Sequence, residues 1–143
     1  MASTVKTTWS GGMAFDAEIN GHHLIMDADA QWGGKDLGPR PKPLLLAALA
    51  GCSGMDIVSI LTKMKVPEYK FQIETAAEST SEDPVIYHTI TVKFMFWGEN
   101  LLPEKLMKAV TLSTERYCGV NAMLKKSANV IVKVLLNDEE VHL

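Results

Sequence analysis

The chain has 143 residues, of which 47% are hydrophobic and 22% are charged, and its formal net charge is −3. This length and composition fit a single globular domain over residues 1–143, with enough apolar side chains to form a core. The mildly acidic balance offers no basic stripe for a phosphate backbone, which argues against nucleic-acid binding.

The first part of the chain predicts a β meander with three strands. The expected strands cover residues 4–10, 13–19 and 22–27. Asn20-Gly21 lies between the last two strands, and it is a strong hairpin signal because both residues tolerate the positive φ of a type I′ turn. Residues 31–43 are dense in glycine and proline, which predicts a loop.

A long helix is predicted from Leu44 to about Met64. Its first half is apolar nearly all the way round, and a helix of this kind is buried on most sides. Gly51, Gly54 and Asp56 interrupt the apolar run after about a dozen residues, so we expect the segment to be too short and too polar to span a bilayer. The N-terminus also lacks the basic start and apolar stretch of a signal peptide. We therefore expect a cytoplasmic protein without membrane association, whose cysteines are normally reduced.

Two strands of alternating polarity follow, over residues 69–75 and 85–97, and they predict a half-buried antiparallel sheet. The apolar face of the second strand is expected to comprise Ile86, His88, Ile90, Val92, Phe94 and Phe96.

Pro103-Glu104 begins a second helix, whose predicted apolar face comprises Leu106, Ala109, Val110, Ser113 and Tyr117. Cys118-Gly119 interrupts this helix, and residues 120–126 are expected to form a separate short one. A last strand over residues 129–136 precedes a polar tail. This order of strands and helices predicts one α+β domain.

The two cysteines, Cys52 and Cys118, are the leading candidates for a functional site. Small residues surround Cys52, which leaves its sulfur approachable, and Asp56 follows on the same helix face. Cys118 begins a short helix, where backbone N–H groups favour a thiolate. Peroxide reduction uses two such thiols, because one attacks the peroxide and the second converts the resulting sulfenic acid to a disulfide. Asp56 would oppose ionisation of a neighbouring thiol unless it orients a cation.

Other interpretations remain open from the residues alone. Two unrelated structural cysteines account for the same pattern. A zinc site is disfavoured because the cysteines and histidines show no C-x-x-C or H-x-x-x-H spacing. A cysteine–histidine nucleophile has no histidine near either cysteine in sequence, and the strand residue His88 is expected to be structural. His22 and His23 are expected to be solvated, and no metal or other cofactor is predicted.

Two segments of the chain resemble the OsmC/Ohr family of osmotically inducible and organic-hydroperoxide-resistance proteins. They are PKPLLLAALAGCSGMDIVSIL, residues 41–61, and STERYCGV, residues 113–120. The resemblance extends over nearly the whole chain, since the order of strands and helices also agrees. It implies an α+β OsmC-like fold, with antiparallel sheets packed on a long central helix, and an intertwined homodimer with active sites at the subunit interface.

The resemblance also implies a function. Cys52 would be the peroxidatic thiol and Cys118 the resolving thiol of a peroxidase that reduces organic hydroperoxides in oxidative stress defence. The family works without flavin, haem or metal, and it takes electrons from dithiols such as lipoylated proteins. Arg40, Lys42 and Asp56 are the residues expected to support the thiolate.

One departure from the family pattern motivates an alternative. Peroxidase members have a glutamate ten residues before the first cysteine, which helps to anchor an arginine beside the thiolate. This chain has Lys42 at that position, and its predicted N-terminal meander contains no arginine. The Cys-x-x-Met-Asp pattern at Cys52 resembles the OsmC-like branch more closely. The alternative is a non-catalytic dimer that binds a small apolar or fatty-acyl ligand.

Overall fold

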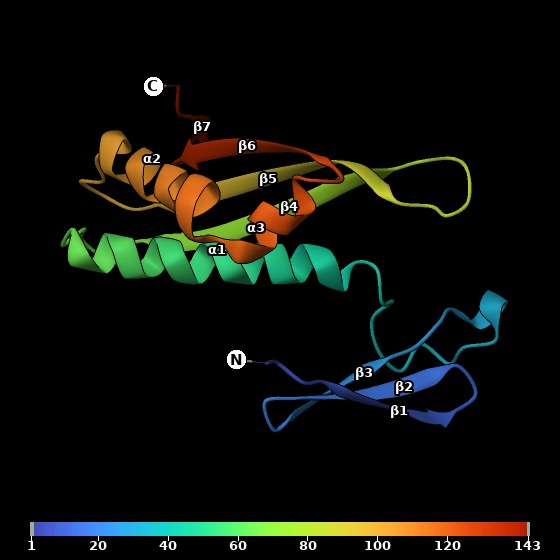
Figure 1. Ribbon diagram of the computed structural model, residues 1–143. Helices are drawn as coiled ribbons and strands as arrows, with labels where there is room; N and C mark the ends of the chain where they lie inside the picture. The colour runs from blue at the N-terminus through green and yellow to red at the C-terminus, as the bar shows by residue number, and fades with distance from the viewer. Residues whose placement is uncertain (1, 143) are drawn as a thin grey trace. The chain divides into compact units, whose positions relative to one another are not determined.

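The computed structural model describes residues 2–142, which form two compact units that divide between Leu45 and Leu46 (Figure 1). The first unit contains a small β-sheet and a long loop. The second unit contains a larger sheet and nearly all of the helical residues.

The sheet of the first unit is the predicted three-stranded antiparallel meander. Its strands are β1 (Lys6–Gly11), β2 (Ala14–Ile19) and β3 (His22–Met26), in the order β1-β2-β3. Asn20 and Gly21 connect β2 to β3 with φ angles of 51° and 81°. Positive φ at both turn residues is what a type I′ hairpin requires, which confirms the predicted turn.

The loop after β3 is organised around the buried carboxylate of Asp27, which is 4% exposed. This carboxylate accepts hydrogen bonds from the backbone N–H groups of Ala28 at 2.7 Å and of Lys35 and Leu37 at 3.1 Å. These bonds, with that from Ala28 the strongest, hold the pKa of Asp27 below its ordinary value. A short 3₁₀ helix, η1 (Ala30–Trp32), interrupts the predicted loop.

The second unit contains a four-stranded sheet in the order β4-β5-β6-β7. Its strands are β4 (Lys70–Ser79), β5 (Tyr87–Trp97), β6 (Asn129–Leu136) and β7 (Glu139–Glu140). Strands β4 and β5 pair antiparallel as predicted, whereas β6 pairs parallel with β5. Parallel pairing requires a crossover, and the helical segment between β5 and β6 provides it. The two-residue strand β7 lies in the expected polar tail.

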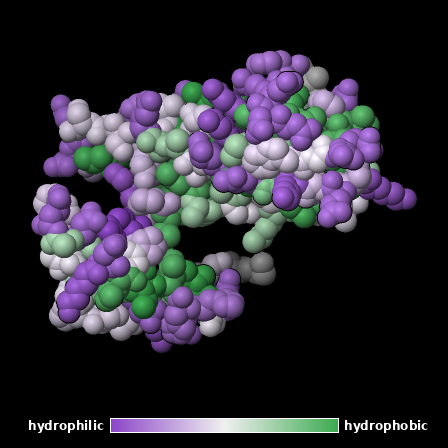
Figure 2. Space-filling view, turned by 180° about the vertical axis from the view of Figure 1, so that it is seen from behind, coloured by the Kyte–Doolittle hydropathy of each residue, from purple (hydrophilic) through white to green (hydrophobic). Residues whose placement is uncertain are grey.

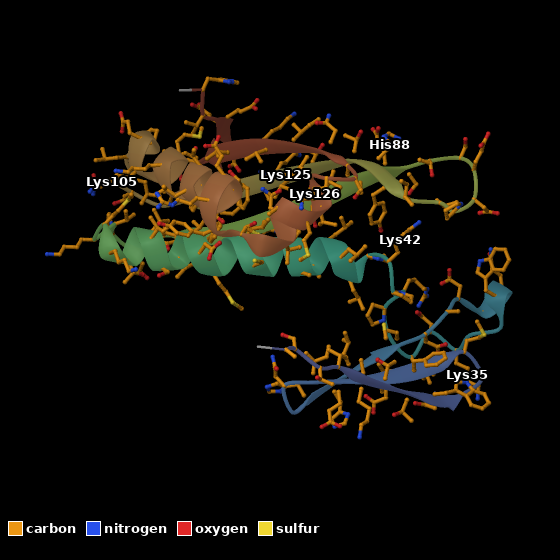
Figure 3. All side chains as sticks on the ribbon, in the orientation of Figure 1. Lys35, Lys42, His88, Lys105, Lys125 and Lys126 are labelled. Carbon is orange, nitrogen blue, oxygen red and sulfur yellow. The ribbon has the colours of Figure 1, made fainter. Side chains whose placement is uncertain are left out.

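Strand β5 supplies much of the core. Ile90, Val92, Phe94 and Phe96 are almost fully buried, as predicted. Ile86 and His88 were expected on the same buried face, and that part of the prediction is wrong. Ile86 is 46% exposed and precedes the strand, while His88 is exposed near its start (Figure 3). The alternation of polar and apolar residues continues to the start of β5, but the helices that cover the sheet do not extend that far (Figure 1).

The predicted long helix is α1 (Leu44–Lys63), which lies along the sheet with α2 and α3 beside it (Figure 1). Its buried residues are Leu49, Ser53, Gly54, Ile57 and Leu61. Leu45, Met55 and Val58 lie on the opposite side and are 47%, 78% and 45% exposed. The expectation of burial on most sides is therefore wrong for a single chain, because the second unit covers only one face of α1.

Gly51, Gly54 and Asp56 do not break α1. Its 20 residues are long and apolar enough that, by length and composition, it is the one helix within residues 2–142 that could cross a membrane. The expectation that this segment is too short and too polar was wrong, because an interior glycine costs only about 1 kcal/mol relative to alanine. The core helix of a soluble protein meets the same criteria, which makes them weak evidence for a span.

The second helical region has three parts, α2 (Pro103–Leu112), the π-helical turn η2 (Ser113–Tyr117) and α3 (Gly119–Leu124). Four of the residues predicted on its apolar face are buried: Leu106, Ala109, Val110 and Ser113. Tyr117 was predicted to join them but is 55% exposed. A π turn contains more residues than an α turn, so Tyr117 is rotated away from the buried face.

Candidate functional site

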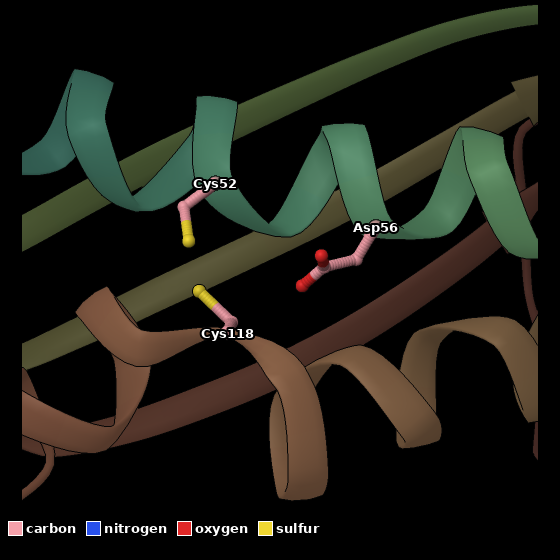
Figure 4. Close-up of side chains that lie close together, drawn as sticks. All are labelled: Cys52, Asp56 and Cys118. Carbon is pink, nitrogen blue, oxygen red and sulfur yellow. The ribbon is translucent and has the colours of Figure 1, made fainter.

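Cys52, Asp56 and Cys118 lie together in the second unit (Figure 4). The two Sγ atoms and one Asp56 carboxylate oxygen all lie within 4.8 Å of one another. Cys52 and Asp56 are one turn apart on α1, and Cys118 lies between η2 and α3. Cys118 is buried, at 3% exposed, whereas Cys52 and Asp56 are half-buried. Both thiols are free, and the structure brings them together with the carboxylate expected beside them.

The break between η2 and α3 orients Cys118. This residue has an extended backbone, with φ −75° and ψ 104°, and it is the N-cap of α3. Its Sγ atom accepts a hydrogen bond from the backbone N–H of Asn121 at 3.3 Å. The sulfur thus has the capping role that a serine or aspartate oxygen usually performs, and the cap holds it toward α1 (Figure 4).

Two buried serines connect the second helical region to α1. Ser53 Oγ donates to Cys118 Sγ at 3.3 Å. Ser113 Oγ lies 3.1 Å from Asp56 Oδ2 and 3.3 Å from the carbonyl oxygen of Ser53, and its single hydrogen serves one of these acceptors at a time. Ser53 is one of the small residues around Cys52, and its hydroxyl was not predicted to contribute to the site. The available signal was a hydroxyl next to a cysteine in an apolar helix.

The surroundings of Cys118 favour its neutral form. Burial raises the pKa of the Cys118 thiol, and the neighbouring Cys52 raises it further. The hydrogen bonds from Ser53 and Asn121 lower this pKa, but burial outweighs them. The backbone N–H group at the start of α3 favours the Cys118 thiolate, as expected, but desolvation disfavours the charged form more than the local donors favour it.

Asn121 is a further polar residue in this region that sequence analysis missed. Its side-chain amide donates to the carbonyl oxygen of Thr114 at 2.5 Å. Its Oδ1 atom is, within residues 2–142, the one buried side-chain nitrogen or oxygen without a hydrogen-bond partner. Asn121 therefore links α3 to η2, the two segments that lie on either side of Cys118 in the sequence.

Arg40 and Lys42 both lie in the first unit, and Lys42 lies two residues before the start of α1 (Figure 3). The Arg40 guanidinium donates to the carboxylates of Asp29 and Asp36, and these acidic partners raise its pKa. The same guanidinium donates to the carbonyl oxygen of Gly38 at 2.8 Å. Arg40 thus organises the loop before α1, and the expected support of the Cys52 thiolate by Arg40 or Lys42 stays a prediction.

The histidines do not form a cluster of their own on the described surface. His22 and His23 are exposed, as predicted, and His23 Nδ1 lies 3.1 Å from the Asp16 carboxylate. His88 Nδ1 lies 2.8 Å from the hydroxyl of the adjacent Thr89. His23 and His88 are therefore exposed side chains with polar partners close to them on the surface.

An open apolar groove of about 630 Å³ lies between α1 and β4. Gly51 and Gly54, on either side of Cys52 in sequence, line it together with Met55, Phe71 and Ile73. The small residues that suggested an approachable sulfur therefore border an apolar surface.

Comparison with known proteins supports the predicted fold. A family model described as OsmC-like protein matches residues 33–133. Protein YhfA of Escherichia coli strain K12 is 32% identical over 126 residues, which are 87% of this chain and 91% of that protein.

Solved structures agree with these sequence matches. A hypothetical protein from Aquifex aeolicus VF5 matches with a TM-score of 0.80 and 28% identity, over 96% of this chain and 97% of that chain. An organic hydroperoxide resistance protein from Legionella pneumophila matches with a TM-score of 0.67 and 16% identity, over 95% and 97% of the two chains. The second likeness shows the shared fold alone. The predicted α+β fold is confirmed, and the chain belongs to the OsmC-like protein family.

Proposed function

We propose that the protein is a thiol-dependent peroxidase that reduces organic hydroperoxides through Cys52 and Cys118. The observation that carries this proposal is the pair of free Sγ atoms within 4.8 Å of each other, one half-buried and one buried. Membership of the OsmC-like family supports it. The hydroperoxide resistance named for the Legionella pneumophila protein of the same fold agrees with this chemistry.

The reaction proceeds in two balanced steps. The Cys52 thiolate attacks one oxygen of the hydroperoxide, so that an S–O bond forms and the O–O bond breaks, and the leaving alkoxide takes a proton from water to become an alcohol. Cys118 then attacks the sulfur of the Cys52 sulfenic acid, an S–S bond forms and water leaves. A dithiol reductant, such as a lipoylated protein, exchanges with the disulfide and restores both thiols.

The two cysteines suit different steps. Cys52 is half-buried and packs against the hydrophobic core, so its sulfur is the more accessible of the two and has apolar neighbours that suit an organic hydroperoxide. Cys118 is 3% exposed and has a raised pKa, so it does not compete as the first nucleophile. Ser53 and the N–H of Asn121 stabilise its sulfur when it is deprotonated during resolution.

Activation of Cys52 requires compensation for the charge of Asp56. An ionised carboxylate near a thiol disfavours the thiolate unless a cation or a hydrogen-bond donor offsets it. The Ser113 hydroxyl is one such donor to Asp56. Arg40 and Lys42 remain the proposed sources of a cation.

We test this function on fully reduced protein treated with cumene hydroperoxide. The expected result is loss of both thiols, formation of one intrachain disulfide and release of cumyl alcohol. In Cys118→Ser the reaction is expected to stop at a sulfenic acid, which dimedone traps. A Cys52→Ser variant that consumes the hydroperoxide as fast as the parent would contradict the proposal.

The proposed assembly is a cytoplasmic homodimer. The exposed side of α1 carries Leu45, Met55 and Val58, and together with the apolar groove it forms a surface suited to burial. Figure 2 shows hydrophobic side chains gathered over the β meander of the first unit as well. In this meander the cross-strand neighbours Trp9 and Phe15 are 63% and 40% exposed. In a dimer these apolar surfaces would be removed from water.

A second function is favoured by the groove beside α1 and by Lys42 in place of the glutamate expected of peroxidase members. In this alternative, a dimer binds a small apolar or fatty-acyl ligand without turnover. Native mass spectrometry of gently purified protein separates the two. Co-purified lipid with unreactive thiols supports the alternative, and an empty protein with reactive thiols contradicts it.

A further inference from the structure

The reduced site offers three donor atoms of the types that bind zinc. Two are the sulfurs of Cys52 and Cys118, and the third is a carboxylate oxygen of Asp56. We propose that these three residues bind a thiophilic divalent ion of the Zn²⁺ class. This inference needs only the reduced thiols and does not rest on the proposed peroxidase function.

The donor spacing is close to that of a bound zinc ion. Thiolates about 2.3 Å from a tetrahedral Zn²⁺ lie about 3.8 Å from each other. The three donors here lie within 4.8 Å of one another. A carboxylate oxygen and a thiolate on one Zn²⁺ lie about 3.6 Å apart, so each pair needs to close by about 1.2 Å at most, which small rotations of Cys and Asp side chains provide.

Sequence spacing disfavoured zinc because no C-x-x-C or H-x-x-x-H motif is present. The structure assembles the donors differently. Cys52 and Asp56 lie four residues apart on one helix, which places both on the same face. Cys118 joins them from the helix break beyond η2. The third donor comes from a segment remote in sequence, so no local motif reveals the set.

Hydrogen-bond donors already support two of the three ligands. Cys118 Sγ accepts from Ser53 Oγ and from the N–H of Asn121, both at 3.3 Å. Asp56 lies 3.1 Å from the hydroxyl of Ser113. Such partners orient metal ligands and stabilise their deprotonated forms, and they are a regular feature of metal sites.

Charge also favours a cation. Two thiolates and one carboxylate would place three negative charges within 4.8 Å in a partly buried position. A divalent ion offsets two of these charges, and thiolates and carboxylates are both ligand types that bind Zn²⁺. Cys52 and Asp56 are only half-buried, so a fourth coordination position is left to water.

The test uses reduced full-length protein under anaerobic conditions without hydroperoxide. Cd²⁺ is added first, because thiolate ligation gives an ultraviolet charge-transfer band. Zn²⁺ affinity is then measured by competition with a chromophoric chelator. We expect one ion per chain, a weaker band in Cys52→Ser, and Zn²⁺ binding weakened by at least roughly 10-fold in Asp56→Asn.

Glu82→Gln is the matched control, because Glu82 is an exposed carboxylate outside the site, and its binding should equal that of the parent. Circular dichroism establishes that each variant is folded. In the parent, bound Zn²⁺ should also slow alkylation of both thiols. Absence of the Cd²⁺ band in the reduced parent would overturn the proposal. Equal Zn²⁺ affinity in folded Asp56→Asn and in the parent would also overturn it, since two thiols alone would then account for binding.

Discussion

The hydroxyl of Ser53 donates to the sulfur of Cys118 at 3.3 Å across a sequence separation of 65 residues. This hydrogen bond joins α1 to the start of α3, and both residues are almost fully buried. The packing of α1 against α3 therefore affects the pKa of the Cys118 thiol, which this hydrogen bond lowers.

We expect Ser53→Ala to slow disulfide formation after oxidation of Cys52, because Cys118 loses a donor that lowers its pKa. Loss of a net hydrogen bond should also reduce the free energy of unfolding by about 0.5–1.5 kcal/mol. Stopped-flow measurement of thiol loss and urea unfolding provide the two readouts. Thr62→Ala is the control, since Thr62 is an exposed hydroxyl on the same helix. Equal resolution rates in parent and Ser53→Ala would show that the bond does not assist Cys118.

The reduced thiols should differ in reactivity. Cys118 is buried and burial raises its pKa, whereas Cys52 is half-buried. We expect iodoacetamide to modify Cys52 first at neutral pH, with Cys118 reacting more slowly, because burial lowers both its thiolate fraction and its access to the reagent. Mass spectrometry of peptides from a time course assigns the order. Modification of Cys118 before Cys52 in folded protein is the contrary outcome.

Asp27 should make the first unit sensitive to acid. Hydrogen bonds from the N–H groups of Ala28, Leu37 and Lys35 depress the pKa of this carboxylate in the folded state. Its stabilising effect is complete above the unfolded pKa of about 3.9, and it is lost as pH falls from there through the lower folded value.

Thermal unfolding between neutral and strongly acidic pH tests this expectation. The parent should lose stability more steeply in acid than Asp27→Asn, which begins less stable at neutral pH because it lacks the charged acceptor. Glu82→Gln should follow the parent. If the thermal stabilities of the parent and Asp27→Asn fell in parallel with pH, Asp27 would not be the cause of the acid sensitivity.

The proposed homodimer can be tested on the exposed side of α1. Val58→Glu introduces a charge where an apolar side chain, 45% exposed in one chain, would be buried against a second copy. Burying an unpaired carboxylate costs at least a few kcal/mol, and a symmetric interface counts each change twice. The dimer dissociation constant should therefore rise by at least roughly 100-fold.

Analytical ultracentrifugation measures this dissociation constant. His88→Glu serves as the control, because His88 is exposed on β5 away from α1 (Figure 3). An unchanged dimer in Val58→Glu, or a monomeric parent at all concentrations, would contradict the proposed interface.

Signals confined to a few neighbouring residues predicted much of the fold. Asn20-Gly21 indicated a hairpin because only its own two φ angles are involved. The long helix from Leu44 was predictable because its run of apolar residues with good helix propensity outweighs the propensity lost at Gly51 and Gly54. The parallel pairing of β6 with β5 was not predictable, since an alternating strand has the same pattern in either direction.

The candidate site also has features that local sequence predicts and features that it does not. The shared helix face of Cys52 and Asp56 was predictable from their spacing, because helical periodicity fixes neighbours four residues apart. Three features follow from the folded chain alone: Cys118 meets this pair, Ser53 and Ser113 bond to the site, and a π turn leaves Tyr117 exposed. Propensity and periodicity act over one or two turns, whereas groups about 60 residues apart are brought together by packing of the whole core.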